Sequence, residues 1–111
     1  MRVAIYIPSL RGGGAERVMV TVANELSGRQ WSVDLVLATA TGPYLSEVSE
    51  RVRIVDLKST RVIKSVPALS TYLRTWRPDT LLAAMSHANM AASMAHWLAR
   101  SSAKLVLSEL S

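Results

Sequence analysis

The chain has 111 residues, of which 50% are hydrophobic and 19% are charged. A chain of this length forms one domain that buries roughly two thirds of the surface exposed when it is unfolded, which excludes a multidomain machine within these residues. Thirteen Lys and Arg against eight Asp and Glu give a net charge of +5, and the hydrophobic content excludes a disordered protein. The sequence has no cysteine, so it offers no disulfide, thiolate metal site or cysteine nucleophile, and a cytoplasmic location is the default expectation.

Two apolar segments have the length of targeting or membrane elements. The first, Met1–Leu10, is not followed by a small-residue cleavage site, so no signal peptide is expected. The second, Leu81–Leu98, is about as long as a membrane span but contains Ser86, His87, Asn89, Ser93 and His96. These side chains are costly in hydrocarbon, and we expect no transmembrane helix.

The N-terminal part of the chain predicts a strand, a helix and a second strand. Val3–Ile7 is a continuous apolar run closed by Pro8, typical of a strand covered on both faces of a parallel sheet. From Ala15 to Leu26 the apolar residues follow helical spacing. Gly28 is expected to end this helix in the left-handed conformation, and Trp31–Ala38 is expected to be a second buried strand.

The remaining residues continue this alternation. Strands are predicted at Arg53–Leu57, Thr80–Met85 and Lys104–Ser108, helices at Val62–Trp76 and Met90–Arg100, and a loop at His87–Asn89. This rhythm predicts a three-layer α/β fold. Right-handed crossovers then favour an all-parallel sheet with the strand order 3-2-1-4-5.

Three consecutive glycines, Gly12, Gly13 and Gly14, lie between the first strand and the first helix. Glycines let the backbone approach a ligand closely, and the amides and dipole of a helix N-terminus favour an anion such as phosphate. The alternative is that the glycines only form a tight turn. A dinucleotide fingerprint would need glycine in place of Arg17, and a P-loop would need Gly-Lys-Ser/Thr, so neither motif is present.

Three polar residues are expected at the same edge of the sheet as the glycine loop. His87 follows the fourth strand, where it would bind a sugar hydroxyl, shuttle a proton or have only a structural role. Asn89 would bind a hydroxyl or cap the following helix. Glu109 follows the fifth strand and is either part of the site or a solvated carboxylate. His96 is assigned to packing within the last helix.

The segment Arg51–Arg77 contains seven basic residues and one acid, Asp56. Such a bias attracts anionic surfaces. The absence of a recognised motif argues against nucleic acid. For the predicted helix within residues 61–77, two alternatives remain: its apolar stripe lies in a lipid headgroup layer, or the stripe packs on the sheet while the charges face water.

Several of these segments resemble retaining glycosyltransferases of family four, which have the GT-B fold. Gly13–Arg17 matches the family's Gly-Gly-Ala-Glu-Arg loop, set between a strand and an amphipathic helix. Arg77–Asn89 is similar to its Lys-Pro-Asp and His-Ala-Asn segment, and Val106–Glu109 is similar to its fifth strand. The resemblance covers the whole chain.

The resemblance implies that residues 1–111 are an incomplete N-terminal, acceptor-side Rossmann-like domain of a GT-B enzyme, without its C-terminal donor domain. Its implied substrates are a nucleotide-sugar donor and a glycan or lipid-linked acceptor. The implied donor-phosphate loop is Gly12–Gly14, and the cleft residues are His87, Asn89 and Glu109. We expect cytoplasmic polysaccharide biosynthesis, with a peripheral membrane contact through residues 61–77 as an alternative. We also expect no metal, because the sequence has no Asp-x-Asp, no other cofactor, and no activity from this chain alone.

A non-catalytic α/β ligand-binding or interaction module, such as a receiver-like domain, is the alternative from another class. A receiver-like domain would carry an acidic cluster at the ends of the first and third strands. Here the first strand is followed by Pro8, Ser9 and Leu10. We therefore favour the glycosyltransferase interpretation.

Overall fold

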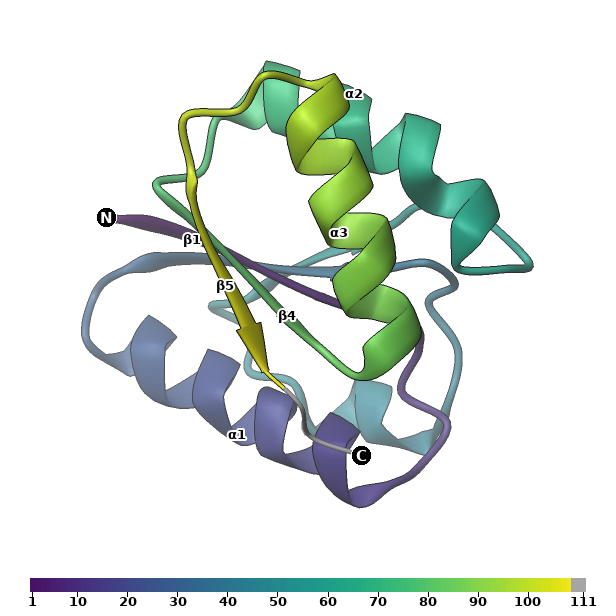
Figure 1. Ribbon diagram of the computed structural model, residues 1–111. Helices are drawn as coiled ribbons and strands as arrows, with labels where there is room; N and C mark the ends of the chain where they lie inside the picture. The colour runs from purple at the N-terminus through teal and green to yellow at the C-terminus, as the bar shows by residue number, and fades with distance from the viewer. Residues whose placement is uncertain (109–111) are drawn as a thin grey trace.

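The computed structural model describes residues 1–108, which form one five-stranded sheet between two layers of helices (Figure 1). The strands are β1 (Arg2–Ile7), β2 (Ser32–Leu37), β3 (Arg53–Asp56), β4 (Thr80–Ala84) and β5 (Lys104–Ser108). All neighbouring strands are parallel, and their order is β3-β2-β1-β4-β5. The α/β class and the strand order predicted from the sequence are therefore confirmed.

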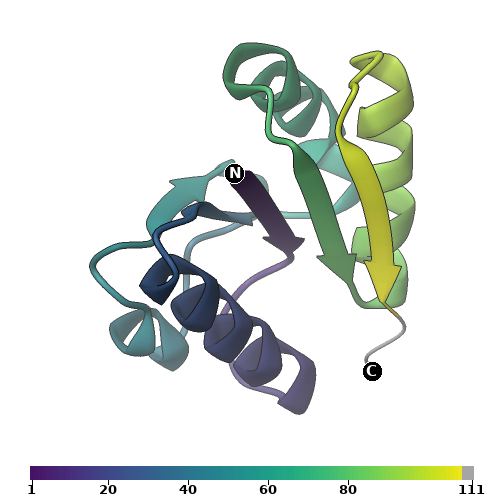
Figure 2. The same cartoon turned by 90° about the vertical axis from the view of Figure 1, so that its left-hand side faces the viewer.

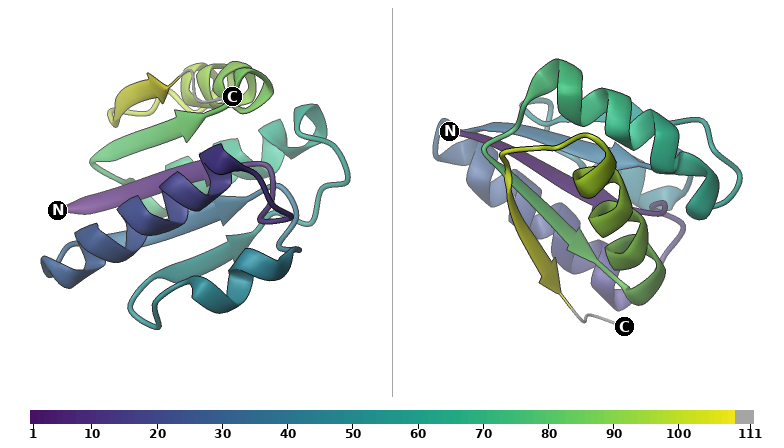
Figure 3. Two further views of the ribbon diagram at one scale, coloured as in Figure 1. Left: turned by 90° about the horizontal axis from the view of Figure 1, so that it is seen from below. Right: turned by 45° about the horizontal axis from the view of Figure 1, so that its top comes forward.

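The two faces of the sheet are covered by different parts of the chain. The helices are α1 (Gly14–Gly28), α2 (Val66–Trp76) and α3 (Ser86–Leu98), with short 3₁₀ helices η1 (Pro43–Glu47) and η2 (Ile63–Ser65). Residues of α1 and η1 share one core with β1 and β2, whereas α2 and α3 share a second core on the opposite face. Figures 2 and 3 show α1 on the side of the sheet opposite to α3.

The stripe predicted on the helix after β3 packs against the sheet. Val66, Leu69 and Leu73 are buried in the core formed with β1, β2 and β4, while Ile63 and Trp76 are exposed. The packing alternative thus holds for the middle of this helix. Its three buried side chains are not free to enter a headgroup layer, contrary to the membrane alternative for residues 61–77.

Two local predictions were wrong. Gly28 is the last residue of α1, and the left-handed position that follows is Gln30, with a φ of 67°. The loop predicted at His87–Asn89 is instead the first turn of α3, which begins at Ser86 directly after β4. The chain reverses at Met85, whose φ is 82°, so no separate loop is needed.

The helix α3 faces the sheet with small side chains. Ala88, Ala91, Ala92 and Ala95 are at most 1% exposed and belong to the core. Alanine side chains let the helix lie close to the sheet, which leaves no room between them for larger side chains. The larger apolar residues of α3 lie on its outer side. Within residues 1–108, no helix is long and apolar enough to cross a membrane.

Candidate functional site

The candidate site lies at the carboxyl edge of the sheet, where the loops after the strands leave the fold. β1 pairs with β2 on one side and with β4 on the other, so the glycine loop after β1 lies between the segments that follow β2 and β4. In open parallel sheets this edge is the usual ligand-binding position.

The glycine loop has backbone angles that favour glycine. Gly12 has a φ of 129°, and Gly13 has a φ of 145° with a ψ of 155°, a region almost restricted to glycine. Leu10 is fully buried and holds the loop against the segment after β2. Its N–H donates to the Thr41 carbonyl at 2.9 Å, and its carbonyl accepts from the Tyr44 N–H at 3.2 Å.

Gly42 completes this contact and was not identified from the sequence. Its φ is 123°, and a Cβ at this position would lie 2.0 Å from both the carbonyl carbon and the carbonyl oxygen of Leu10. The two segments can therefore approach each other only if residue 42 is glycine. The available signal was the Gly42-Pro43 pair, which marks a turn but does not reveal the contact with Leu10.

Glu16 lies in the first turn of α1, and its side chain is folded back over the glycine loop. The residue is 7% exposed, and its Oε2 accepts a hydrogen bond from the Gly12 N–H at 3.2 Å. The Gly12 amide is therefore already engaged, and a carboxylate lies beside the expected phosphate position. Gly14 has open space beside it, because a Cβ added at this residue would meet nothing within 4 Å. The first-turn amides of Gly14 and Ala15 have no acceptor within the helix and are the better candidates for an anion.

His87 and Asn89 both lie in the first turn of α3, but the His87 side chain is exposed and the Asn89 side chain is buried. His87 is exposed and lines a hollow of about 380 Å³ together with Arg61, Ile63 and Met90. No glycine of the loop after β1 lines this hollow. His87 thus faces η2, on the α2 and α3 side of the sheet.

Asn89 is 5% exposed and does not cap α3, so the capping alternative is wrong. Its Nδ2 donates to the Ser108 carbonyl at 2.9 Å, which ties α3 to the end of β5. Its Oδ1 is buried and has no hydrogen-bond partner among residues 1–108. The Met85 N–H also donates to the Ser108 carbonyl, at 3.3 Å. Glu109, the third expected cleft residue, lies outside the described residues.

His96 has the structural role expected from the sequence. One ring nitrogen, Nε2, lies 2.8 Å from the Ala103 carbonyl oxygen. This contact joins the end of α3 to the segment before β5. Within residues 1–108, no group of three or more His, Asp and Glu side chains is placed to hold a metal ion.

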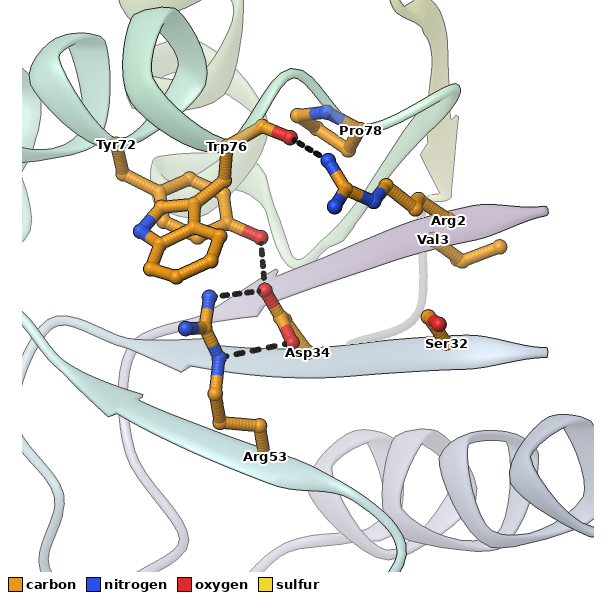
Figure 4. Close-up of a pocket in the computed structure, with 8 residues that line it drawn as sticks. All are labelled: Arg2, Val3, Ser32, Asp34, Arg53, Tyr72, Trp76 and Pro78. Carbon is orange, nitrogen blue, oxygen red and sulfur yellow. Dashed lines mark hydrogen bonds and ion pairs between the residues drawn. The ribbon is translucent and has the colours of Figure 1, made fainter.

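The opposite, amino edge of the sheet carries a polar cluster that sequence analysis did not identify (Figure 4). Arg53 donates from Nε and Nη2 to the two carboxylate oxygens of Asp34, at 3.1 and 2.6 Å, and Tyr72 donates to Oδ2 at 2.6 Å. The Arg53 guanidinium lies 3.8 Å from the centre of the Trp76 ring, and Arg2 donates to the Trp76 carbonyl at 2.7 Å. Because these contacts join β1, β2, β3 and α2, we assign this amino-edge cluster to stability.

The electrostatics of the amino-edge cluster follow from this geometry. Burial and, next, the hydrogen bond to Asp34 raise the pKa of Tyr72 above its ordinary value. The hydrogen bond to Asp34 also raises the pKa of Arg53. Arg53, counted with the basic stretch in the sequence, therefore has its charge balanced within the fold.

The strand order and the glycine loop at the carboxyl edge define a Rossmann-like α/β domain. A comparison with protein families matches residues 12–109 to Glycosyltransferase Family 4. The chain therefore belongs to this family, as the sequence resemblance predicted, and it is a GT-B glycosyltransferase domain rather than a receiver-like module. A search of curated proteins gave no match.

Proposed function

We propose that this chain is the acceptor-side domain of an enzyme that transfers a sugar, of the hexose type, from a nucleotide-sugar donor to a glycan or lipid-linked acceptor in the cytoplasm. The observation that carries the proposal is the family match over residues 12–109, which includes the glycine loop at the carboxyl edge. A donor-side domain of the full enzyme would bind the nucleotide base and ribose.

The first turn of α1 would act on the leaving diphosphate. The amides of Gly14 and Ala15 point out of the N-terminus of a 15-residue helix, and its dipole favours the negative charge that develops as the sugar leaves. Gly12 and Gly13 have positive φ angles and no side chains, so the backbone at these residues would be able to lie close to the phosphates. Glu16, by holding the Gly12 amide, would fix the shape of the loop.

The segment after β4 would face the acceptor. His87 is exposed in the first turn of α3, where its imidazole can bind a hydroxyl or carry a proton. Asn89 is proposed as a second residue on the acceptor side, and its Oδ1 is buried and lacks a partner among residues 1–108. Glu109 follows β5 and remains proposed on the sequence alone.

Amide NMR of the isotopically labelled chain, titrated with inorganic pyrophosphate, tests the phosphate site. We expect the amides of Gly14 and Ala15 to shift in the wild type and in Gly28→Ala, a helical control position with open space around its Cβ. Gly14→Val should fold but lose the shifts, because its side chain would stand between the amides and the ligand. Equal shifts in Gly14→Val, or none in the wild type, would contradict the site. Turnover of a nucleotide sugar by this chain alone would contradict the need for a second domain.

A further inference from the structure

The amino-edge cluster borders a pocket at the end of the sheet opposite to the glycine loop (Figure 4). We call it the amino-edge pocket. It has a volume of about 220 Å³, and its polar lining residues are Arg2, Ser32, Asp34, Arg53 and Tyr72. Pockets for drug-sized ligands have about 300–1,000 Å³. The amino-edge pocket therefore suits a smaller molecule or one functional group of a larger one.

The charged acceptor of the amino-edge pocket is already engaged within the fold. The two carboxylate oxygens of Asp34 accept hydrogen bonds from Arg53 at 3.1 and 2.6 Å, and Oδ2 also accepts from the Tyr72 hydroxyl at 2.6 Å. The Trp76 carbonyl in turn accepts from Nη1 of Arg2 at 2.7 Å. A ligand that donates hydrogen bonds would have to compete with these contacts.

The donors of the pocket exceed these contacts in number. Among residues 1–108, Arg2 uses one guanidinium nitrogen, Nη1, in hydrogen bonds, and Arg53 uses two, Nε and Nη2. A guanidinium group has five N–H groups, so both side chains keep donors for a ligand. The exposed Ser32 hydroxyl adds a further donor. The pocket is therefore complementary to a ligand group that accepts hydrogen bonds.

The charges of the pocket favour a ligand group that is also negative. Two guanidinium groups and one carboxylate line the pocket, and the carboxylate of Asp34 is paired with Arg53. In the described part of the chain, the Arg2 side chain forms no ion pair. Asp79 accepts the Arg2 backbone N–H at 2.7 Å but does not line the pocket. The charge of Arg2 is therefore left to attract an anion.

Regular elements hold the donors in place. Arg2 lies on β1, Ser32 on β2 and Arg53 on β3. The Arg53 guanidinium is fixed by Asp34 and by the Trp76 ring, whose centre is 3.8 Å away, and the Arg2 guanidinium is fixed by the Trp76 carbonyl. Binding to groups that are already ordered costs less conformational entropy.

We propose that the amino-edge pocket binds a small molecule through a carboxylate or phosphate group. Arg2 and Arg53 donate to the oxygens of this group, because the planar guanidinium suits both kinds of oxyanion, and Ser32 donates to a further oxygen. The Trp76 ring and the buried Pro78 contact the carbon atoms that carry the group. The proposal does not depend on the phosphate site of the glycine loop, which lies at the other edge of the sheet.

Amide NMR of the isotopically labelled chain tests the pocket with three probes at constant ionic strength: glucuronate, inorganic phosphate and neutral glucose. We expect saturable shifts of the Arg2, Ser32 and Asp34 amides with one or both anions, and the active anion identifies the group that the pocket takes. No such shifts with either anion, or equal shifts with glucose, would overturn the proposal. Shifts confined to the Gly14 and Ala15 amides would report the glycine loop and would also overturn it.

Matched variants assign the binding to Arg2. Arg2→Gln removes one charge from the pocket and keeps a donor for the Trp76 carbonyl, whereas Lys104→Gln removes one charge at the start of β5 without lining the pocket. Both residues are exposed, so both variants should fold. Arg2→Gln should bind the active anion roughly ten- to a hundredfold more weakly, because it loses a hydrogen bond from a charged donor. Lys104→Gln should bind nearly as tightly as the wild type, and equal weakening in both variants would show a net-charge effect and overturn the proposal.

Ser32→Ala tests the pocket without any change of charge. The side chain is exposed at the start of β2, so its removal should leave the fold intact. We expect binding of the active anion to weaken by about two- to tenfold, the effect of one neutral hydrogen bond. If Arg2→Gln and Ser32→Ala both bind as the wild type does, the anion binds elsewhere and the proposal is wrong.

Discussion

Replacement of Gly42 by alanine should displace Leu10, and with it the segment that leads into the glycine loop. The new Cβ would lie 2.0 Å from the Leu10 carbonyl group, whereas optimal contacts between carbon atoms are about 3.5–4.0 Å, so one segment must move by well over an ångström. The backbone angles of Gly42, with a φ of 123° and a ψ of 161°, add about 1–3 kcal/mol for any other residue. Overpacking adds about 1–3 kcal/mol more.

We therefore expect Gly42→Ala to lower the free energy of unfolding by about 2–6 kcal/mol. Urea denaturation followed by circular dichroism measures this quantity, and Gly28→Ala is the matched control. Gly28 is helical with open space around its Cβ, so alanine there should stabilise the fold by about 0.4–1 kcal/mol. A loss below about 0.5 kcal/mol in Gly42→Ala, the range of ordinary surface substitutions, would refute the argued contact between residue 42 and Leu10.

Three further predictions concern the core, the amino edge and the loop. Leu69→Ala should cost about 2–5 kcal/mol in urea denaturation, because the side chain is fully buried. Tyr72→Phe should cost about 1.5–3 kcal/mol, because Tyr72 donates to the Asp34 carboxylate. Since the pKa of Tyr72 is raised on folding from its ordinary value of about 10, the wild type should keep this stability below pH 10 and lose it as the pH rises further, and Tyr72→Phe should lose less. Glu16→Ala should cost about 0.5–2 kcal/mol and shift the Gly12 amide resonance, and an unchanged resonance would exclude their hydrogen bond.

The arrangement of the strands could be predicted from the sequence because parallel strands covered on both faces are continuous apolar runs. Val3–Ile7 and Lys104–Ser108 were predicted within one residue of β1 and β5. Right-handed crossovers then determined the order of the strands. The position of the glycine loop at the carboxyl edge followed from the order of strand and helix alone.

The details of the site depend on contacts between segments distant in sequence. Gly42 matters because Leu10 lies against it, and no local pattern contains that fact. The helix start at Ser86 was missed because Met85 takes a positive φ that the sequence would normally signal with glycine. In α3, alanines face inward and larger apolar residues face outward, so a prediction that places large apolar residues in the core fails there.

The two edges of the sheet differ in how far they serve stability. At the amino edge, the carboxylate of Asp34 accepts hydrogen bonds from both Arg53 and Tyr72. At the carboxyl edge, Met85 holds a φ of 82°, at a cost of about 1–3 kcal/mol, and the buried Oδ1 of Asn89 has no partner within residues 1–108. Glycine at position 85 would remove the backbone strain without altering the strand order. Backbone strain and an unsatisfied polar atom at this edge are features that ligand binding can use and that folding does not need, so both support the proposal that the domain binds its substrates at the carboxyl edge.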